Sequence, residues 1–107
     1  MIVRRARPGD LVEITFRLPL DHPAAPVGVA GAFNDWTWEA TPLVPCGRHL
    51  VASTVVAAGA RYEFRYRTAD GRWFNDESAD DYVSNEFGGV NCVVDVTSSV
   101  DGDRPGC

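Results

Sequence analysis

The chain has 107 residues, of which 45% are hydrophobic and 23% are charged, and its formal net charge at pH 7 is −5. A chain of this length forms a single domain with its own core, and no apolar run approaches the roughly 18 residues of a membrane-spanning helix. All ten basic residues are arginines, and only the short RRAR segment groups them, so we expect no nucleic acid or membrane partner, whereas a neutral ligand stays open.

The N-terminal segment, MIVRRARPGD, carries arginines but lacks the apolar stretch of a signal peptide. We therefore expect a cytoplasmic protein. Residues 1–9 are expected to form an arm ahead of the domain.

The next stretch predicts two strands joined by a proline-rich connection. Residues 11–18, LVEITFRL, alternate apolar and polar side chains with a period of two, as in a strand with one buried face. PLDHPAAP (19–26) contains three prolines and predicts a loop. VGVAGAF (27–33) predicts the second strand, and Asn34-Asp35 predicts a turn.

Three more strands follow in the second half of the chain. RHLVASTVVA (48–57) is rich in β-branched residues, and RYEFRYRT (61–68) alternates strictly, with aromatic side chains on one face and charged side chains on the other. Asp70-Gly71 is a strong hairpin signal and leads into a short strand, WFN (73–75).

The remaining segments complete the predicted fold. An irregular passage is expected around 42–45, a long loop with at most one helical turn over 76–89, and a closing strand over 90–97. The polar residues 98–107 are expected to form a flexible tail. About seven short strands with turns between them predict an all-β, immunoglobulin-like antiparallel β-sandwich, which forms one domain over residues 10–97.

The best candidate for catalysis is an acidic segment in the predicted loop, with the residues Asp76, Glu77, Asp80 and Asp81. Paired carboxylates can hydrolyse a glycosidic bond, but these lie on one loop without a second wall to hold a substrate. Their spacing also lacks the calcium-loop pattern. We therefore interpret them as a solvated acidic loop and expect no enzymatic activity, no metal and no cofactor; release of sugar from glycogen would revive the enzymatic alternative.

The histidines and cysteines form no catalytic or zinc-binding pattern. His22 lies among prolines, and His49 opens a predicted strand. The three cysteines, Cys46, Cys92 and Cys107, are odd in number and widely spaced. We expect no disulfide framework, but two small apolar residues and a loose thiol in the tail.

Aromatic residues beside turns are the strongest candidates for binding. Trp36, Trp38 and Trp73 all fall at or beside predicted turns, and two interpretations are open. Indoles at strand ends often plug the core. Alternatively they form a platform, because an indole covers the apolar face of a glucose ring while amide and guanidinium groups reach its hydroxyls. Arg65 and Asn91 supply such groups.

Three segments, VGVAGAFNDW, YEFRYRTADGRW and NEFGGVNCVVDV, resemble carbohydrate-binding module family 48 in their order and separation. That family includes the glycogen-binding domain of the β subunit of AMP-activated protein kinase and the N-terminal sandwich domains of isoamylases and glycogen-branching enzymes. The resemblance covers about residues 10–97. It implies a non-catalytic sandwich that binds α-1,4-linked glucan as glycogen, starch or malto-oligosaccharide.

The resemblance also implies roles for individual residues. Trp36 matches the stacking tryptophan after the family's Phe-Asn turn, and Trp73 matches the one after the Asp-Gly hairpin. Arg65 matches a basic residue, and Asn91 an asparagine, that bond sugar hydroxyls. Phe87 matches a loop leucine that presses against the glucan.

The chain departs from the family pattern at three places, and Trp38 is an additional residue. Gly89 stands where the family often has threonine or serine, which removes one hydroxyl contact from the carbohydrate-binding site. Asp76-Glu77 replaces Asp-Pro, so a looser loop is expected, and Phe87 is bulkier than leucine. Trp38 has no counterpart, and we expect it to be partly buried. These departures bear on affinity and preferred chain shape more than on ligand class.

Partners follow from the same resemblance. In the family this domain is usually attached to a catalytic barrel or a kinase assembly, and a (β/α)8 barrel alone takes about 250 residues. We therefore expect a free-standing module, or one that recruits a glycogen-metabolising enzyme or another protein. The alternative is a protein-interaction sandwich of the same fold that has lost sugar binding. Whether Trp36 and Trp73 are open to a sugar distinguishes the two.

Overall fold

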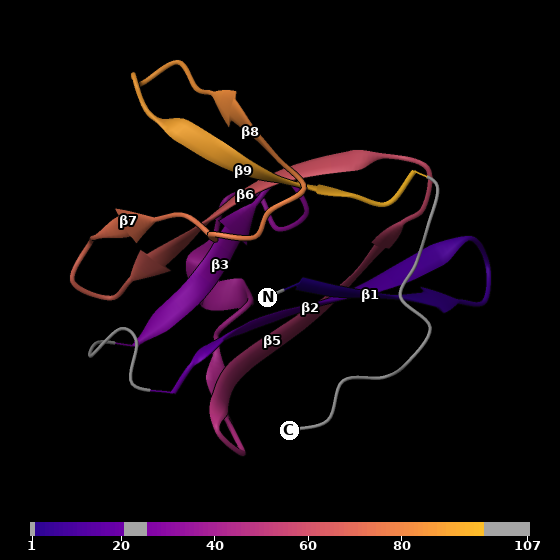
Figure 1. Cartoon of the computed structure of the whole chain (residues 1–107), viewed down its shortest axis with the longest axis horizontal. Coiled ribbons are helices and arrows are strands. Elements are labelled where there is room, and N and C mark those ends of the chain that lie inside the picture. Colours follow the sequence, from indigo (N-terminus) through magenta and orange to yellow (C-terminus); the bar gives the residue numbers. More distant parts are fainter. Residues whose placement is uncertain (1, 21–25, 98–107) are drawn as a thin grey trace.

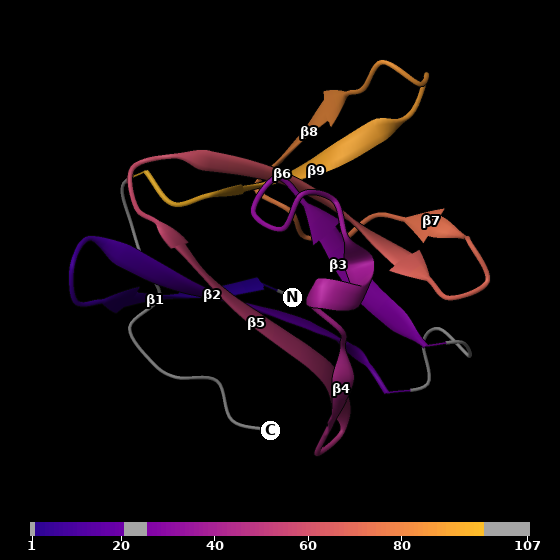
Figure 2. The ribbon, with the colours of Figure 1, turned by 180° about the vertical axis from the view of Figure 1, so that it is seen from behind.

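The computed structural model describes residues 2–20 and 26–97, which form two antiparallel sheets packed face to face (Figures 1 and 2). The β2 sheet has the order β1 (Ile2–Arg7), β2 (Leu11–Pro19), β5 (His49–Ala57) and β4 (Val44–Cys46). The β6 sheet has the order β3 (Val27–Gly31), β6 (Arg61–Thr68), β9 (Val90–Asp95) and β8 (Asp81–Ser84), and β7 (Trp73–Phe74) also pairs with β6. A single 3-10 turn in the described residues, η1 (Trp38–Ala40), follows β3. The all-β sandwich that the sequence predicts is confirmed.

The alternation of β2 decides which of its side chains enter the core. Val12, Ile14 and Phe16 point between the sheets and are at most 2% exposed. Glu13 and Arg17 lie on the other face and reach solvent. Since β1 pairs along one side of β2 and β5 along the other, both edges of this strand are hydrogen-bonded.

The core is centred on aromatic rings from both sheets. The ring centroid of Phe16 lies 5.0 Å from that of Phe64 and 6.3 Å from that of Tyr66, which are distances at which aromatic pairs attract. All three side chains are fully buried. Burial of one phenylalanine contributes about 1.5–3 kcal/mol, so β6 is held firmly with its aromatic face inward. The charged residues between those aromatics must then face outward.

Three strands lie where the sequence predicts other structure. The expected N-terminal arm contains β1, the irregular passage contains β4, and the long loop after β7 contains β8 in place of a helical turn. All three are edge strands that bury few of their side chains, so their sequences show little alternation. Pro45 is tolerated within β4 because an edge strand does not need every N–H for pairing.

The cysteines differ from expectation as well. Cys46 is disulfide-bonded, which corrects its interpretation as an unpaired residue. Cys92 is a free thiol in the core, and burial raises the pKa of this thiol to about 11. It is therefore protonated at neutral pH and a poor nucleophile. Cys107, His22 and the expected tail, 98–107, lie outside the described residues.

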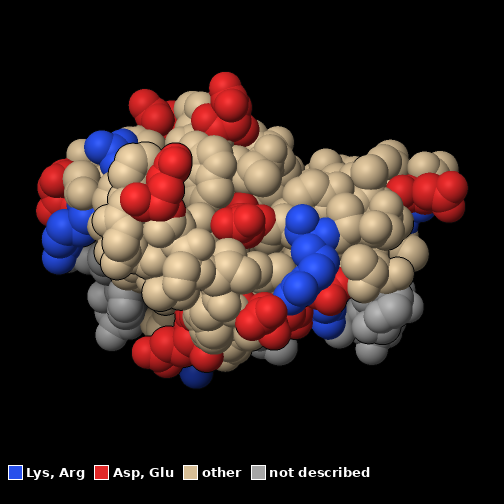
Figure 3. Space-filling model, turned by 90° about the horizontal axis from the view of Figure 1, so that it is seen from above, with Lys and Arg blue, Asp and Glu red and all other residues tan. Residues whose placement is uncertain are grey.

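The described residues contain no helix that is both long and apolar enough to cross a membrane. On the face shown in Figure 3, acidic side chains are spread among large uncharged areas, and the arginine side chains occupy smaller, separate areas. This face is therefore neutral or acidic over most of its area.

Candidate functional site

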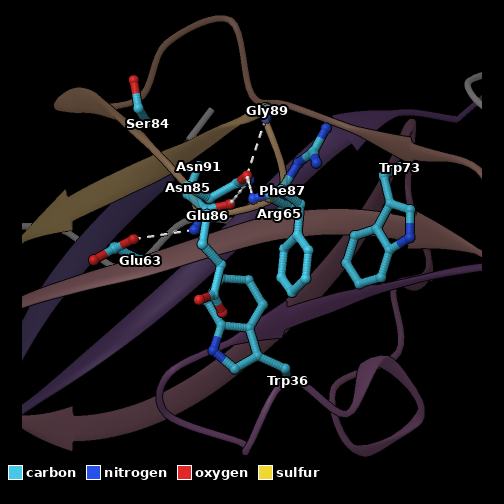
Figure 4. Close-up of a pocket in the computed structure, with 10 residues that line it drawn as sticks. All are labelled: Trp36, Glu63, Arg65, Trp73, Ser84, Asn85, Glu86, Phe87, Gly89 and Asn91. Atoms are coloured by element: carbon cyan, nitrogen blue, oxygen red, sulfur yellow. Dashed lines mark hydrogen bonds between the residues drawn. The ribbon is translucent and has the colours of Figure 1, made fainter.

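A pocket of about 760 Å³ lies on the outer face of the β6 sheet, on the opposite side of β6 from the core. The loop after β3, the β6–β7 hairpin and the β8–β9 turn surround it (Figure 4). Its lining residues are Trp36, Glu63, Arg65, Trp73, Ser84, Asn85, Glu86, Phe87, Gly89 and Asn91. All six residues singled out by the family resemblance are among them. The structure thus brings these residues together, while their role in binding stays a prediction.

Asn34 organises the turn that follows β3. Its Oδ1 accepts a hydrogen bond from Gly31 N at 3.0 Å, and its Nδ2 donates to Val29 O at 2.8 Å and to Thr41 Oγ1 at 2.9 Å. Gly31 has no room for a side chain, because a Cβ there would lie 2.6 Å from the Phe33 ring. The Asn-Asp turn of the sequence is therefore built on one asparagine that ties together two backbone positions and the Thr41 hydroxyl.

Trp36 lies in a strained part of this turn. Asp35 and Trp36 have φ values of 57° and 58°, in the left-handed region, which costs about 1–2 kcal/mol per non-glycine residue. The hydrogen bond from Trp36 N to Gly31 O, 2.9 Å long, holds this conformation. The indole remains 39% exposed. Strain of this kind is concentrated at functional sites, where the surrounding structure enforces it.

The β6–β7 hairpin presents the second indole, Trp73. Thr68 N donates to Arg72 O at 2.9 Å across the turn, and Gly71 adopts a φ of 91°. The Thr68 hydroxyl donates to the Asp70 carboxylate, and this bond, together with Arg72, lowers the pKa of Asp70. Hydrogen bonds of both the backbone and the side chain of Thr68 therefore hold this turn. The Trp73 side chain that follows it is 43% exposed.

Two arginines of β6 pack on the indoles. The guanidinium carbon of Arg65 lies 5.8 Å from the centre of the Trp73 ring, and that of Arg67 lies 5.7 Å from Trp73 and 5.6 Å from Trp38. Each such contact contributes about 0.5–1 kcal/mol at an exposed site. Trp38 is half-buried, as expected, and its backbone packs so closely on Gly28 that a Cβ there would lie 2.1 Å from Trp38 O.

Arg65 is held by its Nε atom, which donates to Asn75 Oδ1 at 2.9 Å. Asn75 in turn donates to Val90 O at 3.0 Å. No carboxylate among residues 2–20 and 26–97 forms an ion pair with Arg65. Its Nη groups are therefore available as donors at the pocket.

The β8–β9 turn is organised by Asn85. Its Oδ1 accepts hydrogen bonds from Phe87 N at 2.9 Å and from Gly89 N at 3.0 Å. Phe87 stands at the tip of the turn and is 88% exposed, far more than any other large hydrophobic side chain described. A Cβ on Gly89 would lie 3.2 Å from Asn85 Nδ2, so the threonine or serine of the family pattern would press on this amide. A side chain at position 89 would therefore require the Asn85 amide to shift by a few tenths of an ångström.

Asn91 connects the turn to β6. Its Oδ1 accepts from Asn85 Nδ2 at 3.1 Å, and its Nδ2 donates to Glu63 Oε1 at 3.0 Å (Figure 4). Asn91 is only 8% exposed. The two amides and the carboxylate thus form a continuous chain of hydrogen bonds along one side of the pocket.

The sequence analysis missed four lining residues: Glu63, Ser84, Asn85 and Glu86. The alternation of β6 could have found Glu63, because it lies on the same face as Arg65. An asparagine shortly before Gly-Gly is a signal for a side-chain-supported turn, which could have found Asn85. No signal in the sequence marks Ser84 or Glu86.

The acidic segment after β7 is part of the fold. Asp76 is 4% exposed, and its carboxylate accepts hydrogen bonds from Tyr66 OH at 2.6 Å and from Ser78 N at 2.7 Å. Burial, and then the charge of Asp76, raise the pKa of Tyr66 well above its usual value. The expectation of a solvated and looser loop is therefore wrong for Asp76.

The remaining carboxylates of this segment lie at the surface. Asp80 pairs with Arg4 at 3.1 Å, and Asp81 pairs with Arg61 at 2.7 Å. Within the described residues, no group of three or more His, Cys, Asp or Glu side chains is placed to hold a metal ion. Asp80 thus ties β1 to the residue before β8, and Asp81 ties β6 to β8.

No protein-family model matches the chain, and no curated protein matches it. Its function is therefore inferred from the chemistry of the pocket. That chemistry combines two part-exposed indoles, one exposed phenyl ring and a mixed set of hydrogen-bond donors and acceptors.

Proposed function

We propose that the protein binds uncharged α-1,4-linked glucan chains, such as glycogen, starch or malto-oligosaccharides, as a non-catalytic module. The proposal is supported above all by one observation: Trp36 and Trp73 are both part-exposed on the same pocket, with Phe87 between them in the view of Figure 4. The resemblance of three sequence segments to carbohydrate-binding module family 48 points to the same ligand.

The aromatic rings suit the faces of glucose residues. Each glucose ring has an apolar C–H face that an indole can cover, with hydroxyls around its edge. The Nη groups of Arg65 donate to such hydroxyls, and the Asn91 amide, which is bonded to Asn85 and Glu63, keeps one further N–H and one further lone pair. Aromatic rings and polar groups around one pocket therefore match the two kinds of surface that a sugar presents.

The exposed aromatic area sets the expected affinity. At 39% and 43% exposure, each indole leaves about 100 Å² for a ligand to cover, which contributes about 2.5 kcal/mol. Covering two indoles and Phe87 gives a gross gain in binding free energy of roughly 6–7 kcal/mol, and a few hydrogen bonds add about 1 kcal/mol each. The loss of translational and rotational freedom on binding costs at least about 4 kcal/mol. The net corresponds to a dissociation constant between about 1 mM and 10 μM.

A site of this strength suits a polymer better than a short sugar. A glycogen or starch particle offers many equivalent segments, so a weak site still retains the protein on it. We propose that the module acts as a tether, either for itself or for a protein partner such as a glycogen-metabolising enzyme.

The direct test is a titration with maltoheptaose, followed by tryptophan fluorescence or amide NMR shifts. We expect saturable binding in the range given above, with the same dissociation constant at low and high salt because the ligand is uncharged. A β-1,4-linked oligosaccharide of equal length is the matched control and should bind more weakly, since its straighter chain presents the rings differently. Failure of maltoheptaose to bind at millimolar concentration would refute the proposal and leave the indoles to a protein interface.

A further inference from the structure

An acidic side chain faces the pocket, and nothing in the proposed function uses it. Glu63 is exposed on β6, two residues before Arg65 and on the same outward face. Its Oε1 accepts the hydrogen bond from Asn91 Nδ2 at 3.0 Å (Figure 4). No ion pair of the described residues includes Glu63, and its Oε2 makes no hydrogen bond within them. One carboxylate oxygen is therefore left at the pocket with its charge unpaired.

The hydrogen-bond chain fixes which atoms face each other. Two backbone N–H groups, of Phe87 and Gly89, bond Asn85 Oδ1, so the NH₂ group of Asn85 must point to Asn91. Asn91 then receives this bond on Oδ1 and turns its own NH₂ group to Glu63. The chain has one direction, and it ends on a group that can only accept hydrogen bonds.

We propose that Glu63 determines specificity at the glucan site: its carboxylate accepts a hydrogen bond from a sugar hydroxyl and weakens the binding of glucan chains that carry phosphate or carboxylate groups. This inference rests on the proposed function. A hydroxyl can donate to Glu63, and a bond to a charged acceptor is stronger than a neutral one. A phosphate has no strong donor to offer and adds like-charge repulsion.

Positive charge in the same pocket is on another side chain. Arg65 lies over Trp73, whereas Glu63 and Glu86 lie on the side nearer Trp36 in Figure 4. A neutral chain that spans both indoles can use Arg65 as donor and Glu63 as acceptor. An anionic chain is attracted by Arg65 and repelled by Glu63. Its affinity relative to that of a neutral chain therefore measures the balance of the two charges.

The test compares maltoheptaose with maltoheptaose phosphorylated on a glucose O6, titrated into the parent protein and into Glu63→Gln by calorimetry. Glutamine keeps the size of the side chain and the acceptor for Asn91 but removes the charge. We expect the parent to bind the phosphorylated chain about five- to tenfold more weakly than the neutral chain. Glu63→Gln should abolish most of this difference and weaken neutral maltoheptaose by about threefold.

Two further variants make the result specific. Glu39→Gln removes an equal charge from an exposed residue outside the pocket and should preserve the parent's discrimination. If it reduces discrimination as much as Glu63→Gln, the effect is one of net charge and the proposal falls. Loss of discrimination in Glu86→Gln alone would also overturn it.

The outcome separates this inference from the proposed function. If the parent binds neutral maltoheptaose and Glu63→Gln, folded by its amide NMR spectrum, discriminates as the parent does, only the role of Glu63 is refuted. If the parent binds neither chain, the proposed function and this inference fall together.

Discussion

The outer faces of the two sheets differ in whether connections between strands project from them. On the β2 sheet, side chains of adjacent strands pair with each other: the hydroxyls of Thr15 and Ser53 are 3.0 Å apart, and Arg17 donates to His49 Nδ1 at 3.0 Å. On the β6 sheet, three connections rise around the strands and surround the pocket. Both sheets contain strands that alternate, so alternation alone does not produce a binding site. The connections supply the concave shape and the aromatic rings.

Removal of both indoles should have the largest effect, because it removes the feature that distinguishes the β6 sheet from the β2 sheet. In Trp36→Ala/Trp73→Ala, the loss of about 5 kcal/mol of gross stacking energy should abolish measurable maltoheptaose binding. Calorimetry is the readout, since the reporter tryptophans are gone. Val55→Ala, which trims a 46% exposed residue on the outer face of the β2 sheet, is the control and should bind as the parent does. A folded double variant with parental affinity would remove the indoles from the site.

The turn that carries Trp36 should depend on Asn34. Asn34→Ala removes three hydrogen bonds, and we expect a loss of about 2–3 kcal/mol in the free energy of unfolding, measured with urea. Maltoheptaose binding should weaken as well, because the strained conformation of Trp36 loses its support. Thr37→Ala, in the same turn, loses only one long exposed bond and should change stability by less than about 0.5 kcal/mol. Equal effects of the two substitutions would contradict this account.

The β8–β9 turn offers a finer separation. Asn85→Ala should cost about 1–2 kcal/mol of stability and weaken glucan binding several-fold, because the amides of Phe87 and Gly89 lose their acceptor. Asn85→Asp keeps that acceptor but loses the donor to Asn91. It should retain protection of both amides from hydrogen exchange, whereas Asn85→Ala should not. Loss of protection in both variants would show that the whole hydrogen-bond chain is needed to hold the turn.

The smallest expected effect is the loss of thermal stability at low pH, when the surface carboxylates away from the pocket become protonated. The hydrogen bond from Arg61, 2.7 Å long, lowers the pKa of Asp81, and bonds from Thr97 lower that of Asp95. Groups with lowered pKa stabilise the fold above their unfolded pKa of about 3.9, and this stability is lost as pH falls through the folded pKa. The thermal midpoint should therefore drop modestly below about pH 4, and Asp81→Asn should flatten part of the drop. A midpoint that rises on acidification would refute the assignment.

Strand prediction succeeded where the apolar pattern is clear, and this includes β3, which lies at an edge of its sheet but has all five of its residues buried. β2 and β6 each have neighbours on two sides and one face in the core, so their sequences alternate clearly. β1, β4 and β8 lie at edges, and their polar residues and proline resemble those of a loop. The missed strands are thus defined by hydrogen bonding to a neighbouring strand and not by burial of their own side chains.

The site residues also divide into those that the sequence marks and those whose partners lie elsewhere in the chain. Turn chemistry and aromatic content marked Trp36 and Trp73 in the sequence. A turn signal places Asn85 and the alternation of β6 places Glu63, but the hydrogen bond of Glu63 to Asn91, 28 positions away, has no counterpart in any local sequence pattern. Asp76 was misjudged because its burial depends on Tyr66, ten residues earlier, which reaches it only in the folded sandwich.

The sequence by itself determined the two faces of β6, because side chains on a strand alternate and the aromatic ones must leave water. It also determined that two tryptophans follow turns. Only the tertiary structure decided that these tryptophans share a pocket. Trp36 lies in the turn after β3 and Trp73 begins β7, and the two meet because β3 and β7 both pair with β6 and because Gly31 lets the first turn lie close against that strand.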